Sequence, residues 1–212
     1  MTSCAFRFRR AIERFDAANA ADPRLVASGG REQPEALLYG RRMTRWLRRL
    51  APGASEPLRL AARCQHLCRW MIPRDSYPMD REGYHRWRTD LARFHAEKAG
   101  EILRDVGYGD VTVGRVQALV RKERLKADPE TQTLEDVACL VFLENYFSDF
   151  AKRHDEPKVL GILARTWAKM SPAGREAALG LDLVPEDRRL IETALARQPG
   201  PARPDPSGRA VP

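Results

Sequence analysis

The sequence predicts an all-α fold, and three observations predict it. Apolar residues recur at intervals of three and four along most of the 212-residue chain, the spacing that gathers them on one face of a helix. We find neither alternating runs of β-branched residues nor hairpin signals, so no sheet is expected. Proline, glycine and serine punctuate the periodic segments, where helices begin and end.

The first half of the chain is predicted to contain four helices, at about 6–20, 35–50, 57–71 and 83–106. Gly29 and Gly30 are expected to form a turn in the loop between the first two. Ser55 is expected to cap the third helix, because Pro57 follows within its first turn. The second helix is amphipathic, and its polar side carries the arginines Arg41, Arg45 and Arg48.

The second half is predicted to contain five further helices, at about 113–122, 131–153, 157–169, 172–180 and 185–196. The segment VACLVFLENYF, within 131–153, is apolar on all sides, whereas a surface helix keeps a polar face. We therefore expect this helix to lie at the centre of the protein. Ser171 and Pro172 are expected to open the helix at 172–180.

These elements predict a single helical domain over residues 1–181, with an HD-domain-like core at about 35–153. A C-terminal helix is expected at 182–196. The remaining segment, 197–212, is rich in proline and glycine and has almost nothing to bury, so we expect a disordered tail.

Charge and composition indicate an anionic partner. The formal net charge is +8, which favours a nucleic acid or a phosphorylated small molecule without choosing between them. No apolar run is long enough to span a bilayer, so no membrane partner is expected. The N-terminus does not resemble a secretory signal, so we expect a cytoplasmic protein whose four cysteines are reduced thiols.

Three ionisable residues fall within apolar helical patterns and are therefore expected to be buried. His95 shares a stripe with Leu91 and Ala99, His66 lies between apolar residues of the preceding helix, and Glu144 lies in the most apolar helix. Buried ionisable groups need a partner or a function. The sequence therefore predicts one shared polar pocket for His66, His95 and Glu144, although packing alone remains an alternative for the histidines.

Basic residues near this predicted pocket favour phosphate binding. Arg69, Arg74 and Arg88 lie close in sequence to the histidines, and guanidinium groups bind phosphate through two parallel hydrogen bonds. Lys122 and Lys126, in LVRKERLK, are expected to add to the same site.

The chain resembles an uncharacterised all-helical family, the domain of unknown function DUF4202. The resemblance is carried by the blocks QHLCRWMIPRDSYP, GYHRWRTDLARFHAEKA, LVRKERLK and LEDVACLVFLENYF, and it covers residues 9–181. It implies no established activity.

The chain is also distantly similar to the HD superfamily of metal-dependent phosphohydrolases. YGRRM resembles the H-x-x-R-V element, with Tyr39 in place of the histidine and Arg42 at the arginine. AARCQHLCRW resembles the helix of the histidine–aspartate pair, with His66 present and leucine replacing the aspartate. FHAEKAGEIL resembles the following histidine helix, with His95 present. LEDVACLVFLEN resembles the late helix, where Asp136 and Glu144 supply carboxylates.

This similarity implies a phosphohydrolase whose His66, His95 and Glu144 hold a divalent metal (Mn, Fe, Zn or Ni) or act as acid and base. Tyr39, Arg42 and Asp136 would then contact the ligand beside the basic residues. Two alternatives stay open. One is a metal-free pocket that binds a phosphorylated small molecule or nucleotide without catalysis, and the other is a helical module that binds RNA or protein through exposed arginines.

Overall fold

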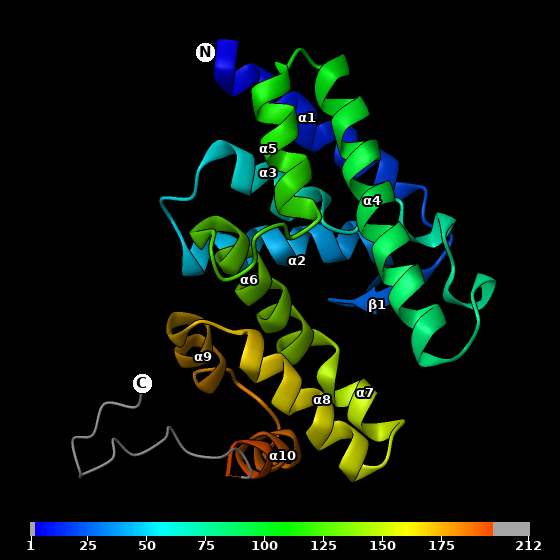
Figure 1. Ribbon diagram of the computed structural model, residues 1–212, viewed down its shortest axis with the longest axis vertical. Coiled ribbons are helices and arrows are strands. Elements are labelled where there is room, and N and C mark those ends of the chain that lie inside the picture. The colour runs from blue at the N-terminus through cyan, green and yellow to red at the C-terminus, as the bar shows by residue number, and fades with distance from the viewer. Residues whose placement is uncertain (1–2, 197–212) are drawn as a thin grey trace, which may run out of the picture.

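A computed structural model describes residues 3–196 and shows a mostly helical protein with one short two-stranded hairpin (Figure 1). The prediction of a helical protein is therefore confirmed. The predicted tail, 197–212, lies outside the described residues. Within the described residues, no helix combines the length and the apolar character needed to cross a bilayer.

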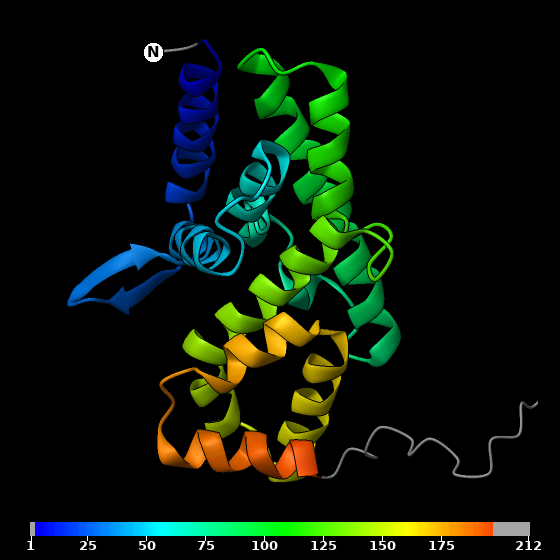
Figure 2. The ribbon, with the colours of Figure 1, turned by 90° about the vertical axis from the view of Figure 1, so that its left-hand side faces the viewer.

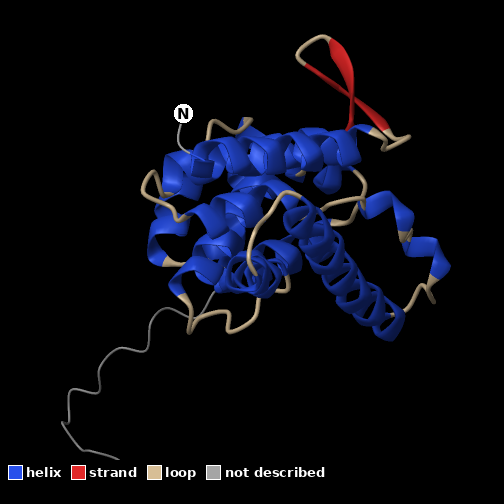
Figure 3. Cartoon of the chain, turned by 90° about the horizontal axis from the view of Figure 1, so that it is seen from above, coloured by secondary structure: helices blue, strands red, loops and turns tan. Residues whose placement is uncertain are grey.

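The hairpin shows that the prediction of no sheet was wrong. Strands β1 (Leu25–Ser28) and β2 (Arg31–Pro34) pair antiparallel around Gly29 and Gly30, whose φ angles are +60° and +76°. Two glycines in this conformation are the favoured loop of a tight hairpin. The strands project away from the helices (Figure 3), so they bury no full face and show no alternating apolar pattern.

Five helices form the upper part of the molecule in Figure 1. There α4 packs along α5, α3 packs against both α5 and α2, and α1 covers α2 and α3. Their bounds are Ser3–Ala20 for α1, Glu35–Leu50 for α2, Glu56–Cys64 for α3, Arg81–Asp105 for α4 and Asp110–Val120 for α5.

Helix α6 (Pro129–Asn145) joins this group to the C-terminal helices. It packs against α2 and α9 and runs between the two groups of helices (Figure 2). Its residues Leu134, Val137, Leu140 and Val141 are fully buried, as predicted for the apolar segment. The C-terminal helices are α7 (Phe147–Lys152), α8 (Glu156–Lys169), α9 (Pro172–Leu179) and α10 (Pro185–Ala196).

The third helix ends much earlier than predicted. Ser55 caps it as expected, by accepting a hydrogen bond from the Leu58 amide at 3.2 Å. However, α3 stops at Cys64 instead of continuing to residue 71, because Cys68 adopts a left-handed conformation with φ of +53°. Two short 3₁₀ turns follow, η1 (Arg69–Met71) and η2 (Arg74–Ser76).

The helix predicted at 131–153 is divided in two at Tyr146. The backbone of Tyr146 leaves the helical region, with φ of −131° and ψ of −16°. Just before it, the Asn145 amide group donates to the Val141 carbonyl at 3.2 Å and to the Glu144 carboxylate at 2.8 Å. Asparagine side chains that bond locally to the backbone compete with helix continuation, which is consistent with this break.

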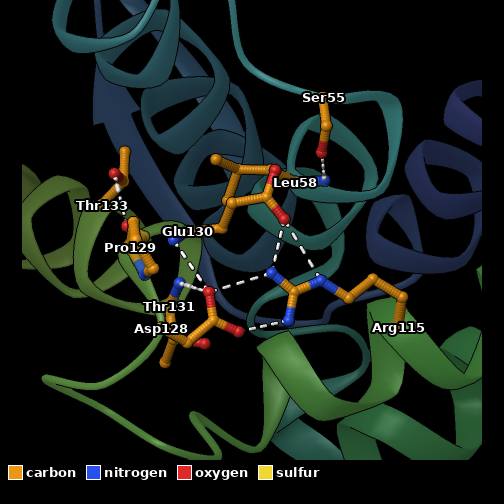
Figure 4. Close-up of polar contacts among 8 residues, drawn as sticks. All are labelled: Ser55, Leu58, Arg115, Asp128, Pro129, Glu130, Thr131 and Thr133. Atoms are coloured by element: carbon orange, nitrogen blue, oxygen red, sulfur yellow. Dashed lines mark hydrogen bonds and ion pairs between the residues drawn. The ribbon is translucent and has the colours of Figure 1, made fainter.

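An ion-pair cluster fixes the start of α6 to α5 (Figure 4). The Arg115 guanidinium pairs with the carboxylates of Asp128 and Glu130, reaching Glu130 at 2.5 Å. Asp128 also accepts hydrogen bonds from the amides of Glu130 and Thr131, so it caps α6. The cluster closes the loop at 121–128, in which three non-glycine residues have positive φ, namely Lys122, Arg124 and Lys126.

We predict that Arg115→Met lowers the free energy of unfolding by about 1–2 kcal/mol, because two partly buried carboxylates lose a charge-assisted partner. Urea denaturation at pH 7 measures this loss. Arg121→Met is the matched control, since the ion pair of Arg121 with Glu123 joins neighbouring residues of one loop. An Arg115→Met protein as stable as the control protein would contradict the proposed role of the cluster.

Candidate functional site

Two cavities, of about 770 Å³ and about 1370 Å³, meet at a shared wall. We call this wall the junction. The residues that line both cavities define it: His66, Arg69, Arg88, Lys122, Glu135, Phe142, Thr166 and Lys169. They come from the turn after α3, from α4, from the loop after α5, and from α6 and α8. The fold thus gathers into one place residues as far apart in the sequence as His66 and Lys169.

The turn after α3 carries His66 and Arg69, and two buried hydrogen bonds hold it. The ring Nδ1 of His95, on α4, lies 2.7 Å from the Leu67 carbonyl oxygen. The Cys68 amide donates to Oδ1 of Asn19, on α1, at 2.9 Å. His95 and Asn19 are both almost fully buried. Two different helices therefore fix the peptide group between Leu67 and Cys68, directly before the left-handed residue.

The same region fixes the side chain of Arg69. The Trp87 indole donates to the Ile72 carbonyl at 2.9 Å, so the ring lies beneath the turn. The Arg69 guanidinium carbon lies 4.7 Å from the centre of the Trp87 ring, within the range of a cation–π contact. Within residues 3–196, no carboxylate lies within ion-pair distance of Arg69.

His95 is a neutral imidazole whose Nδ1 carries the proton. A carbonyl oxygen only accepts hydrogen bonds, so Nδ1 must donate to Leu67. Burial lowers the pKa of His95 to about 4, although the bond to Leu67 opposes the shift; the Arg69 charge lowers it further. The second ring nitrogen, Nε2, is buried without a hydrogen-bond partner in the described part of the chain.

His66 lies on the junction itself and is also neutral. Its ring stacks on Tyr39, with centroids 3.9 Å apart and planes 12° apart, and lies 5.8 Å from the His95 ring. Burial holds the pKa of His66 well below its ordinary value, and the nearby charges of Arg69 and Lys122 lower it further. No residue in the described part of the chain forms a hydrogen bond with the His66 ring.

Glu135 is a site residue that sequence reasoning missed. It is 5% exposed, it accepts a hydrogen bond from Lys122 Nζ, and its other oxygen lies 3.6 Å from Lys169 Nζ. Burial raises the pKa of Glu135, but Lys122 and Lys169 outweigh that effect and keep it below the ordinary value. Its position four residues before Cys139 on the buried stripe of α6 was the available signal.

Tyr39 and Arg74 line the first cavity, as a ligand-binding role requires. The Arg74 guanidinium, however, donates to the backbone carbonyls of Tyr77 and Asp80, so the fold already uses it. Arg42 lies over the Tyr146 ring at 5.2 Å and lines neither cavity. Lys126 is exposed on its loop and also lies outside both cavities.

The structure does not bring Glu144 to the histidines, so the expected convergence of these three residues was wrong. Glu144 lies nine positions after Glu135 in the sequence. This offset is about two and a half helical turns, so the two side chains leave opposite faces of α6. The Glu144 carboxylate accepts hydrogen bonds from Arg45 and the Trp46 indole, both at 2.8 Å.

Asp136 also points away from the cavities. It accepts hydrogen bonds from the Ser171 amide at 2.8 Å and from the Ser171 hydroxyl at 2.5 Å, which fixes the start of α9. Between residues 3 and 196, no three His, Cys, Asp or Glu side chains group in a way that could hold a metal ion. The predicted ligand set of His66, His95 and Glu144 therefore does not fit a shared metal.

We predict that the two histidines differ in their contribution to stability. His95→Ala removes a buried ring and leaves the Leu67 carbonyl without its donor, so the free energy of unfolding should fall by about 3 kcal/mol. His66→Ala removes a partly exposed ring from a cavity wall and should cost about 1 kcal/mol or less. Urea denaturation measures both losses, and equal losses would contradict this assignment.

We also predict that the fold loses stability as the pH falls from about 6.5 toward 4. In this range an unfolded histidine binds a proton, whereas His95, with a pKa of about 4, does not. The free energy of unfolding should then decrease by about 1.4 kcal/mol per pH unit for each such histidine. His95→Asn keeps an N–H for Leu67 but cannot titrate, so denaturation at several pH values should show a shallower slope. An unchanged slope would refute the assignment.

Comparison with known families returns a match. The family model described as a domain of unknown function, DUF4202, covers residues 9–191, which include every residue of the junction. Comparison with curated proteins finds no match, and comparison with solved structures finds none either. Because the matched segment spans most of the sequence, the chain belongs to the DUF4202 family.

Proposed function

We propose that the junction binds the phosphate group of a phosphorylated small molecule or nucleotide. One observation carries this proposal: the junction holds four cationic side chains, Arg69, Arg88, Lys122 and Lys169, and one carboxylate, Glu135. Both histidines beside them are neutral, so the wall keeps an excess of positive charge. An anion that enters would be stabilised by charges already held in place.

Arg69 is the best placed of these cations. Lys122 and Lys169 already share Glu135, whereas Arg69 has no carboxylate partner in the described chain. Burial lowers the pKa of Arg69, and the neighbouring charge of Arg88 lowers it further, which reflects the cost of holding the cation there without a counterion. A bound phosphate would supply that counterion, and the guanidinium plane suits a phosphate that accepts two parallel hydrogen bonds.

The cavities on the two sides of the junction differ in chemistry. The first presents aromatic side chains, including Tyr39, Trp70, Trp87 and Tyr146, which suit the organic part of a ligand. The second is strongly basic: eight of its lining residues are cationic and two are carboxylates, Glu123 and Glu135. A phosphorylated organic molecule at the junction could therefore extend into either cavity.

Hydrolysis of such a ligand by a protein of HD-like fold is a separate hypothesis, which the sequence suggests. The proximity of His66 and His95 on neighbouring elements supports it. The position of Glu144, on the opposite face of α6 from Glu135, does not support the predicted metal set. We therefore propose binding, and not hydrolysis, as the function of the junction.

We predict that Arg69→Gln weakens binding of inorganic phosphate and of AMP by at least about tenfold, because one charge-assisted contact is lost. Isothermal titration calorimetry at fixed salt measures the dissociation constants. Arg48→Gln is the matched control, since Arg48 is an exposed cation of α2 that lines neither cavity. Its dissociation constants should stay within about twofold of the parent protein.

Two results would overturn the proposed function. The first is the absence of measurable binding of both phosphate and AMP to the parent protein. The second is binding of single-stranded RNA that falls steeply with salt and is weakened by Arg48→Gln but not by Arg69→Gln, which would favour an RNA-binding surface on α2.

A further inference from the structure

The polar groups of the junction are nearly all hydrogen-bond donors. Arg69, Arg88, Lys122 and Lys169 can only donate, and the carboxylate of Glu135 is occupied by the two lysines. The dianionic phosphate group of an ester, which only accepts, matches these donors. It does not account for a neutral imidazole in the same wall.

His66 is that imidazole, and its orientation is fixed. The stack on Tyr39 holds one face of the ring, and the His95 ring lies 5.8 Å away. His66 lines both cavities, yet no residue in the described chain satisfies either of its nitrogens. One nitrogen of a neutral imidazole donates a hydrogen bond and the other accepts one. The ring thus presents an acceptor among donors, three positions before Arg69.

We propose that His66 forms a hydrogen bond with a hydroxyl group of the ligand, which makes the ligand a phosphate ester of a polyol or sugar. This inference rests on the proposed binding of phosphate at the junction. A hydroxyl both donates and accepts, so it satisfies either nitrogen of the ring. An alkyl group can do neither, and a phosphate oxygen can satisfy only the N–H, because it has no proton to give to the acceptor nitrogen.

The position of His66 also limits where that hydroxyl lies in the ligand. His66 and Arg69 belong to one tight turn and line the same wall, so the hydroxyl must be a few bonds from the phosphorus. Polyol and sugar phosphates carry hydroxyl groups at this separation. His66 is then a specificity-determining residue, since it distinguishes hydroxylated from plain alkyl phosphates.

A matched pair of probes tests this inference, namely sn-glycerol 3-phosphate and n-propyl phosphate, which differ in two hydroxyl groups. At pH 8, where His66 stays neutral, the parent protein should bind the glycerol ester on the order of tenfold more tightly. His66→Phe keeps an aromatic ring against Tyr39 but removes both nitrogens. In the His66→Phe protein, the dissociation constants for the two esters should become about equal. The dissociation constant for n-propyl phosphate should change by less than about threefold.

His154→Phe is the control for this substitution. The His154 ring also stacks on an aromatic side chain, Phe150, but it lies outside both cavities, so the parent ratio should persist. Circular dichroism and thermal unfolding establish that both variants are folded.

The outcomes separate the two proposals. Equal binding of both esters by the parent protein overturns the role of His66 but leaves phosphate binding intact. Retention of the tenfold preference by a folded His66→Phe protein does the same. If neither ester binds and inorganic phosphate also fails to bind, the proposed function falls and the inference falls with it.

Discussion

The hydrogen bond between His95 and the Leu67 carbonyl is the constraint on which the candidate site depends. It is buried, it joins α4 to the turn after α3, and it lies beside the left-handed Cys68. If α3 continued regularly to residue 71, the directions of the His66 and Arg69 side chains would be set by the geometry of that helix alone. The interrupted helix instead presents both side chains to the wall between the two cavities.

This constraint explains why the charges of the junction can lie so close together. The bonds to His95 and Asn19 fix the backbone that carries Arg69, and the Trp87 ring fixes its side chain. Glu135 offsets part of the repulsion by pairing with Lys122 and Lys169. Neutral His66 and His95 add no charge of their own. The Arg88 guanidinium carbon lies 6.0 Å from the centre of the Tyr84 ring. The fold therefore tolerates a positive wall because each cation is either paired with a carboxylate or placed over an aromatic ring.

Much of the fold follows from local sequence signals. Ser55 and Ser171 cap the helices that they were predicted to cap, and the apolar segment of α6 is central. The end of α3 was not predictable in the same way. The apolar repeat of Leu60, Cys64, Leu67 and Met71 continues past it, and the groups that stop the helix come from α1 and α4. Tertiary contacts override a local pattern here.

The candidate site was likewise predictable from the sequence only in part. Its cations in the segments 69–88 and 122–126 stand out by charge, and the structure places Arg69, Arg88 and Lys122 at the junction. Which glutamate of α6 faces the cavities depends on the rotation of the helix about its axis. The sequence of a uniformly apolar helix does not reveal that rotation. Glu144 lies in the most apolar stretch but faces Arg45 and Trp46, whereas Glu135 faces the cavities.

The backbone of Lys122 has an evolutionary consequence. Its φ of +57° is a conformation that glycine adopts freely and that a lysine side chain disfavours. Replacement by glycine would relax the loop but remove a cation from the junction. Selection for stability alone would therefore favour glycine at position 122, whereas selection for the site would favour lysine. A more stable loop would bind the anion more weakly.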